Sequence, residues 1–221
     1  MSENLDDLAA VSALADGVRR AAYGMVATAG NSPVGRDEVA ESLGIGRTLA
    51  AFHLDKLVDV GLLEVSYARR SGRTGPGAGR PAKLYRISAA EHAVSVPPRA
   101  YRTAAELLAE ALERSGADET LNRVALAYGR QAGPGCPEVT ELLTGHGYAP
   151  TVDPEESRIE LRNCPFHRLA EQFPPLICGM NLAMITGLLE GAGLTGWQAR
   201  MEPAPGRCCV TVSATSKNKS D

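Results

Sequence analysis

The chain of 221 residues has no long uninterrupted apolar run. No stretch approaches the roughly 18 consecutive apolar residues of a membrane-spanning helix, so we expect no membrane partner. The segment MSENLDDLAAVSALAD is acidic and lacks the basic and apolar parts of a secretory signal. These absences predict a cytoplasmic protein, in which cysteines stay reduced.

Common enzyme signatures are also missing. The patterns GxSxG and HExxH, which position a nucleophilic serine or a catalytic zinc, do not occur, and a dinucleotide-binding glycine pattern is absent too. Cys164 and His167 are a candidate nucleophile–base pair, but both fall within one local turn and no orienting residue is evident. An enzyme is therefore the least favoured interpretation.

Length and charge favour a molecule of two parts. The chain is long enough for one large or two small domains, and its hydrophobic content of 44% is ordinary for a globular protein. The net charge is −3, but residues 1–90 carry 11 basic and 10 acidic side chains, whereas residues 91–221 carry 12 and 16. Because the local field governs phosphate binding more than the total charge, the first part remains compatible with DNA binding.

The residues from 36 to 60 have the pattern of a helix-turn-helix. RDEVAESL predicts an amphipathic helix, and the sequence GIG after it predicts a short turn. A second helix is predicted from Arg47 to about Val60, and Gly61 stands where a glycine ends many helices. Its core face is predicted to hold Leu49, Phe52, Leu54, Leu57 and Val58. Its other face would meet a major groove, with Arg47, Thr48, His53 and Lys56 as candidate DNA-binding residues.

The segment after this helix predicts a hairpin with a basic tip. LLEVSYARR and KLYRIS read as two strands, joined by SGRTGPGAGRPA. Between Ser66 and Arg86 the chain has six basic residues and no acidic one, which is typical of a wing that binds phosphates or a minor groove. The candidate DNA-binding residues here are Arg69, Arg70, Arg73, Arg80 and Lys83. The glycines do not form a phosphate-binding loop, because GxxxxGK[ST] is absent.

The expected fold is mainly α with α+β parts. An N-terminal winged helix-turn-helix DNA-binding domain is predicted for residues 1–90, and a helical linker and dimerisation region for residues 91–146. In the linker, the amphipathic helix YRTAAELLAEALERSG either joins two subunits or packs within its own. A small C-terminal α+β domain of order β-β-α-β-β is predicted for residues 147–213, and a disordered tail for residues 214–221.

Four of the five cysteines fall in this last domain. Cys164 is expected to end a strand, Cys178 to lie in the first turns of a helix, and Cys208 and Cys209 to open the last strand. A helix N-terminus favours the thiolate, the form that binds metal, and these three ends could converge at one edge of the sheet.

Convergent thiolates would suit an iron–sulfur cluster or a tetrahedral zinc ion. His167 follows Cys164 closely and is a candidate fourth ligand. Because neighbours on a strand point to opposite faces, one of Cys208 and Cys209 is expected to pack in the core. Inert core cysteines and a thiol redox switch remain alternatives to a metal site.

Several of these segments together carry a family resemblance. The N-terminal half resembles the ArsR/MarR-type winged-helix regulators. GRPAKLYRIS, NCPFHRLAEQFPPLICGMNLAMITGLLEG and PAPGRCCVTV resemble the SufR-like branch, and the similarity runs from about residue 12 to 213. Members of that branch are iron–sulfur-dependent repressors of cluster-assembly genes, together with close homologues of unknown signal. The resemblance implies Cys164, Cys178 and one of Cys208 and Cys209 as cluster ligands.

The hypothesis that follows is a homodimeric transcriptional regulator. Each subunit would bind one half of a palindromic operator in double-stranded DNA, so the two-fold symmetry would set the half-site spacing. Within the regulator class, a zinc sensor and a regulator gated by a small organic effector remain alternatives.

Overall fold

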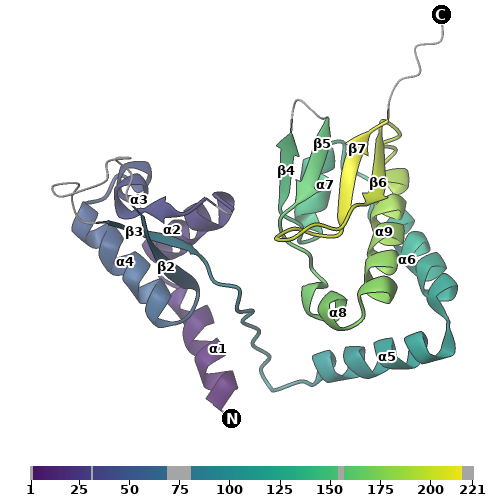
Figure 1. Ribbon diagram of the computed structural model, residues 1–221, viewed down its shortest axis with the longest axis horizontal. Coiled ribbons are helices and arrows are strands. Elements are labelled where there is room, and N and C mark those ends of the chain that lie inside the picture. The colour runs from purple at the N-terminus through teal and green to yellow at the C-terminus, as the bar shows by residue number, and fades with distance from the viewer. Residues whose placement is uncertain (1, 31, 69–80, 154–156, 216–221) are drawn as a thin grey trace, which may run out of the picture. The chain divides into compact units, whose positions relative to one another are not determined.

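The computed structural model describes residues 2–30, 32–68, 81–153 and 157–215, and it divides into two compact units (Figure 1). One unit comprises Met1–Arg99 and the other Ala100–Asp221. Each combines helices with one small antiparallel sheet. Within the described ranges, no helix is both long enough and apolar enough to cross a membrane.

The N-terminal unit packs helices against a three-stranded sheet. Its elements are α1 (Ser2–Ala13), α2 (Gly17–Thr28), β1 (Val34–Gly35), α3 (Arg36–Leu43), α4 (Arg47–Asp59), β2 (Leu63–Ala68) and β3 (Ala82–Ile87). The sheet order is β1-β3-β2, and β2 pairs with β3 from Leu63 opposite Ile87 to Ala68 opposite Ala82. The predicted hairpin is therefore confirmed. The two-residue strand β1 was not expected, because a strand this short has no alternation to reveal it.

Local sequence signals explain where the helices of this unit begin and end. The Asp16 carboxylate accepts a hydrogen bond of 2.9 Å from the Arg19 backbone N–H and so caps α2. Gly44 ends α3 with φ of 62°, and Gly61 follows α4 with φ of 78°. These left-handed conformations favour glycine, so the predicted turn and the predicted helix end are both confirmed.

The buried face of α4 is rotated from the predicted one. Its buried residues are Ala50, His53, Leu54 and Leu57. Leu49 and Phe52, which were assigned to the core, are exposed, with Phe52 at 52%. The prediction that His53 faces solvent is wrong, since its exposure is 6% and its Nδ1 lies 3.9 Å from Asp16 Oδ1. The four buried residues have the spacing of one helix face. The prediction placed Leu49 and Phe52 on the core face because they are larger and more hydrophobic than the alanine and the histidine that are buried there.

The C-terminal unit combines a four-stranded sheet with five helices in the part of the chain that is described. Its elements are α5 (Tyr101–Ser115), α6 (Asp118–Ala132), α7 (Val139–Gly145), β4 (Pro150–Asp153), β5 (Arg158–Leu161), α8 (His167–Gln172), α9 (Pro174–Gly191), β6 (Trp197–Met201) and β7 (Val210–Ala214). In the sheet order β4-β5-β7-β6, the last strand of the chain, β7, lies between β5 and β6. The predicted β-β-α-β-β order is confirmed, with the short helix α8 as an addition. Helices α5, α6 and α7, expected in a linker region, belong to this unit.

Helices α6 and α9 lie side by side at close range (Figure 1). Gly129 on α6 and Gly187 on α9 mark the contact. A Cβ atom at Gly187 would stand 2.2 Å from the Leu126 carbonyl oxygen, and one at Gly129 would stand 2.3 Å from that of Met184. Only glycine permits this backbone approach, which holds α9 and its cysteine against the rest of the unit.

Candidate nucleic-acid interface and cysteine site

The exposed face of α4 presents polar and apolar side chains together. Its exposed residues include Arg47, Thr48, Leu49, Phe52 and Lys56. An exposed aromatic or aliphatic side chain on a helix that enters a major groove can contact the methyl group of thymine. The exposure of Leu49 and Phe52 was not predicted from the sequence, because large apolar residues are assigned to the core by default.

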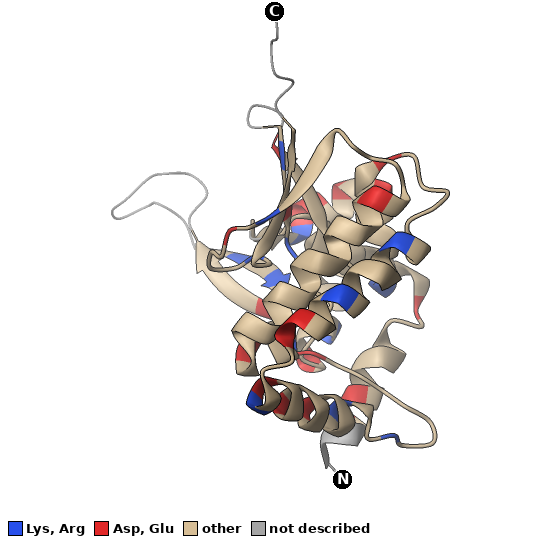
Figure 2. Ribbon diagram, turned by 90° about the vertical axis from the view of Figure 1, so that its right-hand side faces the viewer, with Lys and Arg blue, Asp and Glu red and all other residues tan. Residues whose placement is uncertain are grey.

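Two of the predicted DNA-binding cations are paired with neighbouring acids. The Arg47 guanidinium contacts Asp37 twice, at 2.5 and 3.0 Å, and Lys56 Nζ lies 3.1 Å from Asp59. Figure 2 shows acidic and basic residues mixed along the helices. Because both pairs are exposed, each contributes little to stability, and a DNA phosphate can replace the acid as partner.

Lys83, another predicted DNA-binding cation, makes a contact within its own unit. Its Nζ lies 2.6 Å from Asp55 Oδ1, and the Tyr85 hydroxyl donates to the same oxygen at 2.8 Å. Partial burial acts to raise the pKa of Asp55, but the hydrogen bonds from Lys83 and Tyr85 outweigh it and hold that pKa below its usual value. The three residues therefore fasten β3 to α4, and the ammonium group is already engaged.

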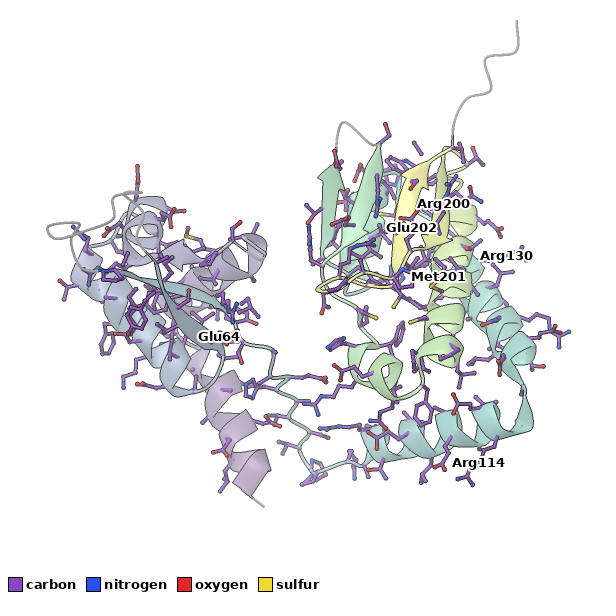
Figure 3. All side chains as sticks on the ribbon, in the orientation of Figure 1. Glu64, Arg114, Arg130, Arg200, Met201 and Glu202 are labelled. Atoms are coloured by element: carbon purple, nitrogen blue, oxygen red, sulfur yellow. The ribbon has the colours of Figure 1, made fainter. Side chains whose placement is uncertain are left out.

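The tip of the predicted wing lies outside the described residues. Arg69, Arg70, Arg73 and Arg80 all belong to that stretch, so they remain predictions. The strands that flank it end opposite each other, at Ala68 and Ala82. Arg86, the last cation of the basic run, pairs at 2.8 Å with Glu64 on the neighbouring strand β2. Glu64 is labelled in Figure 3.

The four C-terminal cysteines lie together as two interacting pairs. The thiols of Cys164 and Cys208 interact with each other, and so do those of Cys178 and Cys209. The charge of Cys208 also acts to raise the pKa of Cys178. All of them are free thiols. The connection after β5, the start of α9 and the approach to β7 each supply part of this group, defined here as the cysteine site.

Cys208 packs in the hydrophobic core at 4% exposure, whereas Cys209 is only partly buried, so the prediction that one of the two packs in the core is confirmed. Both still belong to the cysteine site. They precede β7, which begins at Val210, and so are not bound by the alternation of a strand. His167 is not brought into the group. Its side chain is 66% exposed and its Nε2 lies 3.2 Å from Glu171.

The thiols differ in how readily they ionise. The hydrogen bond with Cys164 is the main cause that lowers the pKa of Cys208 to about 7, against the opposing effect of burial. The same hydrogen bond, followed by burial, raises the pKa of Cys164. Burial, followed by the hydrogen bond with Cys209, raises the pKa of Cys178 to about 12. The predicted lowering of the Cys178 pKa at the helix N-terminus is therefore wrong, because burial disfavours the charged form of this thiol.

Buried polar groups surround the Cys208 sulfur. It accepts hydrogen bonds from the Asn181 side-chain amide at 3.3 Å and from the Val210 N–H at 3.5 Å. The Tyr148 hydroxyl donates to the Asn181 oxygen and fixes the orientation of that amide. The Arg207 side chain is only 9% exposed, and its Nη1 has no hydrogen-bond partner in the described part of the chain. These groups favour negative charge on sulfur.

The chemistry of the site suits a thiolate-binding metal group. Four cysteine sulfurs are a ligand set of zinc ions and of iron–sulfur clusters, and buried N–H donors with a buried arginine compensate their charge. Among the described residues, however, no three Cys, His, Asp or Glu side chains converge in an arrangement ready to hold a metal ion. The structure thus shows interacting thiols but no preformed metal site among the described residues.

Comparisons with known proteins assign no family to this chain. No protein-family model matches it, and no curated protein does either. The resemblance to SufR-like regulators stays a prediction, and function is inferred from the two sites themselves.

Proposed function

We propose that the chain is a homodimeric, sequence-specific DNA-binding transcriptional repressor whose C-terminal unit responds to an iron–sulfur cluster or to thiol oxidation. The N-terminal unit carries this proposal. Helix α3, a glycine turn and helix α4 are followed by an antiparallel hairpin whose connecting segment is rich in arginine. This order of elements is that of a winged helix-turn-helix, which binds DNA through its second helix and its wing.

The exposed face of α4 defines the proposed contact with the bases. Arg47 can donate to a guanine edge, Thr48 and Lys56 can bind base edges or phosphates, and Phe52 can meet a thymine methyl. His53 is no longer a candidate DNA-binding residue, because its side chain is buried. The arginines of residues 69–80 would bind the flanking phosphates, where they add affinity more than sequence discrimination.

Helix α5 supports the homodimer. The apolar stripe of this amphipathic helix is mostly exposed, with Leu107 at 62% and Leu108 at 65%, whereas the buried residue of the helix is Ala109. Leu107 and Leu108 therefore do not pack within their own unit, although Leu112 on the same stripe packs against the buried cluster around Ala109. The two exposed leucines favour the subunit interface over the alternative left open by the sequence. A Leu107→Asp, Leu108→Asp variant should sediment as a monomer at concentrations where the wild type is a dimer, and equal sedimentation of the two would contradict this interface.

The cysteine site supports the sensing role. Cys164, Cys178, Cys208 and Cys209 are the residues that would hold a cluster or a zinc ion, and an iron–sulfur cluster there would supply an oxidation-labile centre. The chain's own groups prepare the site, because Asn181 donates to sulfur and Arg207 lowers the cost of thiolate charge. A change in the site alters DNA binding only if the two forms of the protein differ in their affinity for DNA.

DNA binding is tested by selecting duplexes from a random library and measuring the affinity of the best one. Phe52→Ala should weaken binding to that duplex about tenfold, while binding to unrelated DNA stays nearly unchanged. Met201→Ala is the matched control, since Met201 is an exposed apolar residue on β6 of the other unit (Figure 3). Failure to enrich any sequence, or equal effects of the two variants, would contradict the proposal.

The metal is tested by analysing iron, sulfide and zinc in protein purified without oxygen. A cluster predicts brown protein with stoichiometric iron and sulfide, lost in a Cys164→Ala, Cys178→Ala variant and kept in Cys136→Ala. Cys136 is the appropriate control because it is the one cysteine outside the site. Zinc without iron would favour a zinc sensor over a cluster. If neither metal is found, thiol oxidation is left as the signal.

A further inference from the structure

An apolar pocket of about 450 Å³ opens in the C-terminal unit. Helices α6 and α9 and the segment after Cys164 line it, and the residues that carry its chemistry are Val124, Tyr128, His146, Phe166, Met180 and Met184. Its volume falls within the range of small-molecule sites, about 300 to 1,000 Å³. Neither the proposed DNA contact nor the cysteine site uses these side chains.

The lining of the pocket suits a flat aromatic molecule. Tyr128 and Phe166 offer ring faces and edges, and the two methionines offer flexible thioethers that adapt to the outline of a ring. Val124 and Tyr128 are mostly exposed although they line a concave site. A bound aromatic ligand would therefore remove apolar surface from water on both the ligand and the protein.

His146 provides the polar group, and its environment defines what it can bind. Its Nδ1 lies 2.8 Å from the Leu142 carbonyl oxygen. A carbonyl only accepts, so Nδ1 carries the proton, and in the neutral ring Nε2 is left as an acceptor. A ligand hydroxyl can donate to that nitrogen, whereas a methyl group in the same place cannot.

We propose that this pocket binds a planar, bicyclic-sized aromatic molecule with a single hydroxyl group, which donates its hydrogen bond to His146 Nε2. This site goes beyond the proposed function, which requires no ligand here. Phe166 follows Cys164 by two residues, so an occupant would contact the same segment that supplies part of the cysteine site.

The test uses two probes of nearly equal shape, 2-naphthol and 2-methylnaphthalene, and the full chain labelled with carbon-13 at its methionine methyl groups. Met180 and Met184 line the pocket, whereas Met25 lies in the other unit and Met201 on β6. We expect both probes to shift the resonances of Met180 and Met184 and to leave Met25 and Met201 unchanged. One additional hydrogen bond predicts about tenfold tighter binding of 2-naphthol.

Two variants separate the hydroxyl contact from the apolar pocket. His146→Leu should abolish the preference for 2-naphthol while keeping the affinity for 2-methylnaphthalene. Val124→Trp, at an exposed position on the pocket wall, should weaken both probes at least about tenfold without disturbing the core. Unchanged Met25 and Met201 resonances check that each variant is folded.

Several outcomes would overturn the proposal. These are equal affinity of the wild type for both probes, a preference that survives in His146→Leu, or equal shifts of the four methionines named above. Met180 and Met184 resonances that change with protein concentration and ignore both probes would instead show that a second copy of the chain covers the pocket. DNA takes no part in this test, so its failure leaves the proposed function standing.

Discussion

Among the described residues, the candidate functional groups are exposed in the N-terminal unit and mostly buried in the C-terminal unit. In the N-terminal unit the proposed DNA-binding groups lie on the exposed face of α4. In the C-terminal unit Cys178 and Cys208 are buried, and Asn181 and Arg207 are enclosed beside them. Contact with a phosphate backbone needs exposed cations, whereas control of thiol chemistry needs shielding from water and fixed N–H donors. The cysteine site of the C-terminal unit therefore depends on internal packing more than the exposed face of α4 does.

The largest expected effect is confined to the C-terminal unit. A Cβ atom added at Gly187 would lie only 2.2 Å from the Leu126 carbonyl oxygen, and Gly187→Val adds two further methyl groups to that atom. We expect it to destabilise that unit by about 3 kcal/mol and to leave the N-terminal unit unaffected. Hydrogen exchange resolved by residue measures both units in one experiment.

Gly179→Ala is the matched control on the same helix. A Cβ there would meet only the Asn122 amide, at 3.5 Å, and alanine has the higher helix propensity, so this variant should be neutral or slightly stabilising. Equal loss of protection in both units of Gly187→Val would show that the units do not fold independently and would break the comparison.

The second prediction removes charge from each unit in turn. Arg70→Ala, Arg73→Ala should lower the slope of log affinity for DNA against log salt by about 2, because two phosphate contacts are lost. Arg114→Ala, Arg200→Ala removes the same charge from the C-terminal unit and should leave the slope nearly unchanged (Figure 3). Fluorescence anisotropy across a salt series measures both. Matching slopes in the two double variants would assign the salt dependence to net charge and exclude the wing.

The smallest effect concerns the contact that fastens β3 to α4. Asp55→Asn should destabilise the N-terminal unit by about 1 kcal/mol at neutral pH, a modest value because the carboxylate is half exposed. The folded pKa of Asp55 lies below the ordinary 3.8, so its contribution is complete above that pH and is lost as the pH falls through the folded value.

Wild type should therefore lose stability more steeply than Asp55→Asn when the pH drops below about 4. Denaturant unfolding of the full chain between pH 2 and pH 7, followed by tyrosine signals of the N-terminal unit, measures the difference. Asp59→Asn is the control on the same helix, since Asp59 is more exposed and pairs only with Lys56 among the described residues. Parallel pH curves for Asp55→Asn and wild type would refute the role given to Lys83 and Tyr85.

The same contrast explains what the sequence could predict. Glycine and turn signals act within a few residues, so the ends of α3 and α4 and the β2–β3 hairpin were predicted correctly. The burial of His53 could not be read from its residue type, because it depends on Asp16 and α2 packing against α4. Local signals fail where a partner from a distant part of the chain decides the outcome.

Distance along the chain limited the prediction of the C-terminal unit more strongly. The elements were predicted, but the close approach of α6 and α9 needs glycines on two helices to be recognised as partners. The pairing of Cys164 with Cys208 and of Cys178 with Cys209 likewise depends on the β5–β7 pairing and on the chain before β7. The sequence predicted that these thiols converge at one edge of the sheet, and packing determined which of them interact.

The most direct test of the account is the affinity of the full chain for its selected duplex before and after oxidation with hydrogen peroxide. If the buried cysteine site controls the exposed DNA-binding face, oxidation should change the Kd at least about tenfold in wild type and in Cys136→Ala. The change should vanish in Cys164→Ser, Cys178→Ser. An unchanged Kd in oxidised wild type, or an equal change in that double variant, would contradict the coupling of the two units.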